Sequence, residues 1–130
     1  MISVATSVAI TALTAAILGL MQVVFTLRVG MYRQANQISL GDGGDKELEK
    51  RMRAHGNFIE TVPMALILIL LNEISGASST LLYGLAAVLI VARLMHYISI
   101  AYRTRLIFRV IGMLSTLLVI AVAALALLVG

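Results

Sequence analysis

Four apolar stretches, each long enough to cross a lipid bilayer, constrain the fold of this chain more than any other feature. Of its 130 residues, 61% are hydrophobic and only 12% are charged. The stretches lie at about residues 2–28, 54–73, 78–101 and 106–129. A spanning helix needs roughly 20 apolar residues, and in hydrocarbon its backbone N–H and C=O groups must bond to one another. The sequence therefore predicts an all-α integral membrane protein, a single transmembrane four-helix domain over residues 1–130.

Charged residues before the second stretch are expected to extend its helix beyond the membrane. The predicted helices are 2–28, 47–73, 78–101 and 106–129, with a loop at about 34–46. The first stretch lacks a positively charged start and is too long for a cleaved signal peptide, so it is predicted to remain in the protein.

Short polar signals mark where these helices begin and end. Asp45 is expected to cap the second helix, and Gly76 to end it. Ser78 or Ser79 is expected to cap the third helix.

Basic residues gather at two of the three connections. Those that flank the first connection are Arg28, Arg33, Lys46, Lys50, Arg51 and Arg53, and those that flank the third are Arg103, Arg105 and Arg109. The short second connection has none. Because positively charged loops stay in the cytoplasm, the first and third connections are predicted to be cytoplasmic and both termini to lie outside. The isoelectric point of about 10.0 is explained by this topology, and no nucleic-acid partner is predicted.

A cluster of polar residues lies within the apolar stretches. Arg53, Asn57 and Glu60 are spaced i, i+4 and i+7, which places them on one face of a helix. Arg93 lies in the third stretch, at a depth where antiparallel packing could pair it with Glu60. Charges at membrane depth cost roughly 3 kcal/mol or more each and mark candidate functional sites. Two arginines and one carboxylate predict a net positive pocket that needs an anion.

Two interpretations of this cluster remain open on residue types alone. It could be a buried Arg–Glu–Arg network that fixes how the helices pack. It could also bind a small zwitterionic molecule with net negative charge, such as a small peptide, because arginines fork onto carboxylates and a Glu accepts from an ammonium group.

The remaining polar residues favour no metal chemistry. The chain has no cysteine, so any reactive thiol must come from the substrate. His55 and His96 would need further ligands, and only Glu60 is near, so no metal site is predicted. Tyr97 is interpreted either as an interfacial anchor or as a hydroxyl donor to the site.

Two motifs resemble a known family. They are Arg53-Ala54-x-x-Asn57-x-x-Glu60-x-x-Pro63 in the second helix and Ala92-Arg93-x-x-His96 in the third. With the chain's length, four spans and charged first loop, they resemble the membrane-associated proteins in eicosanoid and glutathione metabolism (MAPEG). This family includes microsomal glutathione transferases and leukotriene-forming synthases. Gly41-Asp42-Gly43-Gly44 and His55-Gly56-Asn57 look most like its small bacterial branch, which implies the bacterial inner (cell) membrane.

The resemblance implies a homotrimer of left-handed four-helix bundles with glutathione sites between neighbouring subunits, open to the cytoplasm. The residues implied to bind glutathione are Arg28, Arg53, His55, Asn57, Glu60, Arg93, His96 and Tyr97. The sequence departs from the family at Thr61 and Ile100, where some members have Tyr. Where leukotriene-forming synthases have a thiol-activating Arg, spacing places Ile107, so Arg105 and Arg109 are both candidates for catalysis.

The implied function is that of a glutathione transferase or peroxidase. It would join the glutathione thiolate to lipophilic electrophiles from the bilayer or reduce lipid hydroperoxides, with glutathione as co-substrate and membrane lipids around it. One alternative is a non-catalytic member of the same fold that binds a lipid or scaffolds partners. Another is a small proton-coupled exporter, although such exporters carry an unpartnered acid in the first helix, and none is found there.

Overall fold

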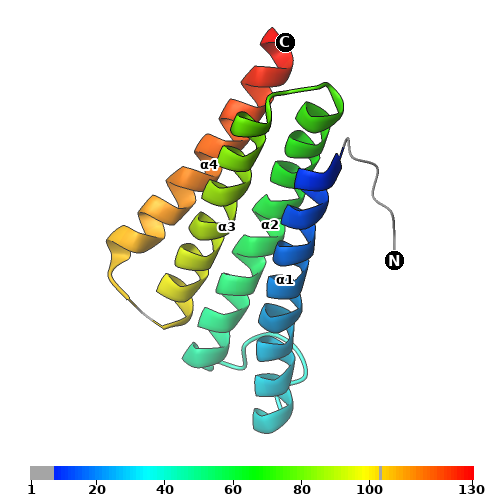
Figure 1. The fold of residues 1–130 in the computed structure, drawn as a ribbon. Coiled ribbons are helices and arrows are strands. Elements are labelled where there is room, and N and C mark those ends of the chain that lie inside the picture. The colour runs from blue at the N-terminus through cyan, green and yellow to red at the C-terminus, as the bar shows by residue number, and fades with distance from the viewer. Residues whose placement is uncertain (1–7, 103) are drawn as a thin grey trace.

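The computed structural model describes residues 8–102 and 104–130, and over these ranges the chain forms four helices and no strand. The helices are α1 (Ala9–Asn36), α2 (Lys46–Ile74), α3 (Ser79–Ala101) and α4 (Leu106–Val129), and they run antiparallel along the chain (Figure 1). Each is long and apolar enough to cross a membrane. The predicted all-α class is therefore confirmed.

The helix bounds lie close to the predicted ones except in α1. That helix ends at Asn36 rather than near residue 28, because its last turns are polar and contact the charged start of α2. Hydropathy locates the part of a helix that suits hydrocarbon and not the part that continues into water. The predicted start of the first helix, over residues 2–7, lies outside the described residues.

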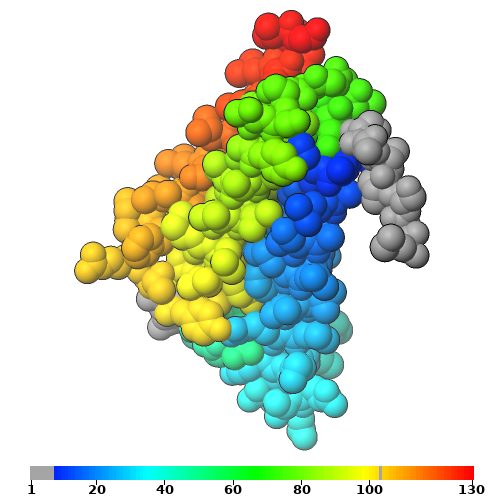
Figure 2. All heavy atoms as spheres, viewed as in Figure 1, coloured from blue at the N-terminus to red at the C-terminus, as the bar shows by residue number. Residues whose placement is uncertain are grey.

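The centre of the bundle is the pair α2 and α3. α1 packs against both of them on one side, and α4 packs against both on the other, while α1 and α4 share no contact over the described ranges. In Figure 2 the side chains of α1 (blue to cyan) and α3 (yellow-green) meet along the face toward the viewer. The α1–α2 and α3–α4 connections lie at one end of the bundle, and the α2–α3 connection at the other (Figure 1).

The predicted caps are confirmed. The Asp45 carboxylate accepts from the backbone N–H groups of Glu47 and Leu48, at 2.9 and 3.0 Å. The hydrogen bond from Leu48 and a second from the Tyr32 hydroxyl hold the pKa of Asp45 below its usual value, so it is an anion at neutral pH. Ser78 caps α3, and Gly76 follows α2 with a left-handed φ of 82°.

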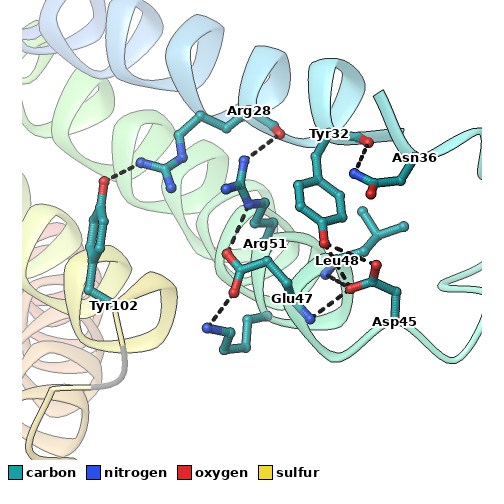
Figure 3. Close-up of polar contacts among 9 residues, drawn as sticks. Arg28, Tyr32, Asn36, Asp45, Glu47, Leu48, Arg51 and Tyr102 are labelled. Atoms are coloured by element: carbon teal, nitrogen blue, oxygen red, sulfur yellow. Dashed lines mark hydrogen bonds and ion pairs between the residues drawn. The ribbon is translucent and has the colours of Figure 1, made fainter. Parts of the chain in front are cut away.

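Polar contacts fasten the last turns of α1 to the first turns of α2 (Figure 3). The Tyr32 hydroxyl donates to both carboxylate oxygens of Asp45, at 3.1 and 3.0 Å. Arg51 donates to the Arg28 carbonyl at 3.2 Å and to Glu47 at 3.1 Å, and its guanidinium lies 4.6 Å from the centre of the Tyr32 ring. The charged start of α2 is thus part of the bundle and not a free tail.

At the opposite end, α2 supplies the cap that α1 lacks. The residue before α1, Val8, makes no side-chain cap. Instead the buried Glu73 carboxylate accepts from the backbone N–H groups of Ile10 and Thr11, at 2.8 and 2.7 Å. The first N–H groups of a helix have no partner within it and favour a negative charge, so Glu73 satisfies both needs from a neighbouring helix.

We expect Glu73→Ala to lower the free energy of unfolding by about 1–3 kcal/mol, because two buried N–H groups lose their acceptor. Thermal unfolding of the purified protein in one detergent measures the effect. Glu49→Ala is the matched control, since within the described residues Glu49 pairs only with Lys46, which is 78% exposed, and such pairs contribute little. Equal losses in the two variants would contradict the capping role.

Candidate polar pocket between α2, α3 and α4

A pocket of about 690 Å³ opens between α2, α3 and α4 near the α1–α2 connection. Arg53, Asn57 and Glu60 line it together from α2, because their spacing places them on one face of the helix. The predicted face therefore points into a real cavity. His96 lines the pocket from α3, and Arg109 lines it from α4.

The walls of this pocket differ in chemistry. The α2 wall is mostly polar, whereas α4 contributes Val110, Met113 and Leu114 beside Arg109. A ligand in this space would therefore meet hydrogen-bonding and charged groups on one side and an apolar surface on the other.

The charges in the pocket are more mixed than predicted. Its lining includes three carboxylates, from Asp42, Glu49 and Glu60, and two guanidinium groups, from Arg53 and Arg109. An adjoining hollow of about 480 Å³ shares Glu49, Arg53 and Arg109 with it and adds Lys46 and Lys50. The lysines thus add positive charge at the start of α2, while the three acids come from the α1–α2 connection, the first turn of α2 and its middle.

Arg93 lies behind the pocket rather than in its lining. Its side chain is 1% exposed, and it donates to Asn57, Thr61 and the Gly112 carbonyl. The expected pairing with Glu60 is wrong, because the two residues form no ion pair within 4 Å. Similar depth along antiparallel helices did not bring them together, since Arg93 points between α2 and α4, whereas Glu60 is exposed at the pocket.

Three predicted site residues lie in α1 or on the side of the bundle that packs against it. The ring nitrogen Nε2 of His55 is 3.0 Å from the Thr26 hydroxyl. Arg28 donates to the Tyr102 hydroxyl (Figure 3), and its guanidinium lies 5.0 Å from the centre of that ring. The buried Tyr97 ring is stacked on Phe25, with ring centres 3.4 Å apart. Arg28, His55 and Tyr97 therefore do not line the pocket.

The two candidate arginines for catalysis are separated by the start of α4. Arg109 lies one turn inside the helix and lines the pocket. Arg105 is the exposed residue just before the helix and is absent from the lining of both hollows. Over residues 8–102 and 104–130, no group of three or more metal-binding side chains is found.

Sequence reasoning missed two residues that shape the pocket. Asp42 reaches the lining from the glycine-rich connection, which the sequence predicted only as a loop. Gly112 lets α3 and α4 approach closely, because a Cβ there would lie 2.9 Å from both the Ala92 carbonyl oxygen and the His96 Cβ. A small residue on the pocket side of an otherwise bulky helix was the available signal for Gly112.

The fold and the pocket define a class of integral membrane four-helix protein with a polar site between helices. The sequence profile of the MAPEG family matches residues 11–129. The chain is also 35% identical over 94 residues to the inner membrane protein YecN of Escherichia coli strain K12, an alignment that covers 72% of each chain. The protein of the same name from E. coli O6:H1 strain CFT073 gives the same values. The chain belongs to the MAPEG family.

We expect Gly112→Ala to lower the stability of the bundle by about 1–3 kcal/mol, because the added methyl group overpacks the α3–α4 contact. Thermal unfolding in detergent measures this loss. The control is Gly19→Ala in α1, where an added Cβ has no neighbour within 4 Å and where Ala favours the helix. Unchanged or increased stability in Gly112→Ala would contradict the close contact.

Proposed function

We propose that the protein is a glutathione-binding membrane enzyme, a transferase or peroxidase that acts on lipophilic electrophiles or lipid hydroperoxides. One observation carries the proposal. The family-motif residues Arg53, Asn57, Glu60 and His96 line a single pocket, and Arg109 lines it with them. The same pocket combines a polar wall for a peptide with an apolar wall for a lipophilic partner.

The chemistry of glutathione suits the groups in this pocket. Glutathione has two carboxylates, one ammonium group and two peptide bonds. Arg53 and the lysines of the outer hollow can bind carboxylates, and Glu60 can accept from the ammonium group. The mixture of three acids with the basic residues favours a zwitterion over a simple anion.

Arg109 is the residue that we propose activates the thiol. A free thiol has a pKa of about 8.5 and is mostly protonated at neutral pH, and a neighbouring cation increases the thiolate fraction. Arg109 lies beside the apolar wall formed by Val110 and Met113. In a transferase step the thiolate sulfur would bond to the electrophilic carbon, and the leaving group would carry away the bonding electrons.

The other side of the bundle is assigned to assembly. We infer a homotrimer of left-handed bundles, as the family resemblance implies, with each site between two subunits. On this proposal Arg28 of α1 and His55, which contacts α1, do not line their own pocket and contribute to the site of a neighbouring subunit. The basic connections lie in the cytoplasm, so that glutathione enters from that side.

A non-catalytic member of the same fold is the second candidate. The observation that favours it is Ile107, which stands where the spacing of leukotriene-forming synthases places the activating Arg. Such a protein would bind a lipid or a partner without forming a thiolate.

We expect the purified protein to bind glutathione and to show the ultraviolet absorption of a bound thiolate. Arg109→Ala should abolish the thiolate band, whereas Arg105→Ala, the matched control outside the pocket, should retain it. Arg53→Ala should raise the Kd for glutathione roughly 10- to 100-fold, the equivalent of about 1.5–3 kcal/mol for hydrogen bonds to a charged group.

Calorimetric titration with glutathione separates the candidates. Binding without a thiolate band in the wild-type protein would favour the non-catalytic member. No binding at millimolar glutathione would reject the proposed glutathione-binding function. Equal loss of the band in both arginine variants would reject Arg109 as the activating residue.

A further inference from the structure

We propose that Arg93 is a positioning residue that fixes the orientation of the Asn57 side-chain amide, so that Asn57 presents N–H donors to the pocket. The ligand atom at this position must then be an acceptor, such as a carboxylate or carbonyl oxygen or a thiolate sulfur. The identity of the ligand as glutathione rests on the proposed function. The orientation of the amide does not.

The contacts of Arg93 do not support a direct role in ligand binding. Its Nη1 atom donates to Asn57 Oδ1 at 3.2 Å and to Thr61 Oγ1 at 3.1 Å, and its Nη2 atom donates to the Gly112 carbonyl at 3.2 Å. The side chain is 1% exposed and is absent from the pocket lining, whereas Asn57 is part of it. Arg93 therefore reaches the pocket through Asn57.

These contacts determine which end of the amide faces the ligand. A guanidinium group has donors and no acceptor, so only the oxygen of Asn57 can face Arg93. The alternative orientation would place the amide nitrogen, also a donor, against a buried cation. With Oδ1 engaged, the two N–H bonds of Nδ2 are the polar groups left for the pocket.

Thr61 fixes the same arrangement from the next turn of α2. Its hydroxyl donates its only proton to the backbone carbonyl of Asn57 at 3.0 Å, so its oxygen is free to accept from Arg93. The three hydrogen bonds that join Arg93, Asn57 and Thr61 then have mutually consistent directions. This set also shows a physical role for Thr61 at the position where some family members have Tyr.

The charge of Arg93 makes the amide a better donor. Within the described part of the chain, no carboxylate oxygen lies within 4 Å of an Arg93 nitrogen. Its hydrogen bond to Asn57 Oδ1 polarises the amide, and hydrogen bonds in such chains strengthen one another where the dielectric constant is low. The positive charge of Arg93 therefore strengthens the Asn57 N–H donors in the pocket, although Arg93 itself does not line it.

Asparagine NMR tests the orientation without any ligand. The chain has three asparagines, Asn36, Asn57 and Asn72. Protein labelled with ¹⁵N-asparagine therefore gives three side-chain amide groups in the spectrum. The variant Asn57→Asp identifies the signals of Asn57. A cation at Oδ1 increases the double-bond character of the C–N bond and slows its rotation. We expect exchange of the two Asn57 amide protons to accelerate in Arg93→Met, which removes the cation, with the Asn36 and Asn72 signals unchanged. Equal rotation rates in the wild type and Arg93→Met would overturn the proposal.

Titration with glutathione tests the consequence for binding. We expect Arg93→Met to raise the Kd roughly tenfold in the wild-type background and less than twofold in Asn57→Ala, because the two residues act as one unit. Equal effects of Arg93→Met in both backgrounds would show that Arg93 acts independently of Asn57.

Asn57→Asp provides a second variant that preserves an acceptor for Arg93. We expect it to keep the thermal stability of the wild type and to lose glutathione affinity, because a carboxylate offers no donor to the ligand. Retained affinity would overturn the donor assignment even if the Arg93 variants do not fold. If the wild-type protein binds no glutathione, the proposed function fails, and the amide rotation rates still decide the orientation.

Discussion

The buried guanidinium group of Arg93 is the interaction on which the geometry of the pocket depends. Arg93 extends from α3 and bonds to α2 through Asn57 and Thr61 and to α4 through the Gly112 carbonyl. A charge in this position is stable only if neighbouring oxygens satisfy it. These oxygens come from α2 and α4, so Arg93, which extends from α3, links the three helices that surround the pocket.

The bundle is held by different means at its two ends. Near the pocket, Tyr32, Asp45 and Arg51 join α1 to α2 through charged and aromatic contacts. At the far end, single buried polar groups join the helices. Asn72 of α2, for example, donates to the Ala123 carbonyl of α4 at 2.8 Å. Between the ends, a core of buried apolar side chains surrounds the hydrogen bonds of Arg93, and close approach at Gly112 compensates for the weak driving force between helices in lipid.

Periodicity and hydropathy predicted the helices and one face of the site, and tertiary packing decided the rest. Arg53, Asn57 and Glu60 could be grouped because they share one helix. The partners of Arg93 could not be predicted, since the depth of a residue in the bundle does not determine the direction in which its side chain points. Arg105 and Arg109 could not be distinguished without the rotation of α4 against its neighbours. Asp42 reaches the pocket through the path of a loop, which local sequence does not encode.

The cap that Glu73 provides has a consequence for how the chain assembles. The residues it joins are separated by 63 and 62 positions in the sequence. When α1 has been synthesised, the acceptor for its first N–H groups does not yet exist, and it becomes available only with the far end of α2. The first two helices therefore complete their structure as a pair, and the start of α1 is fixed by a residue translated much later.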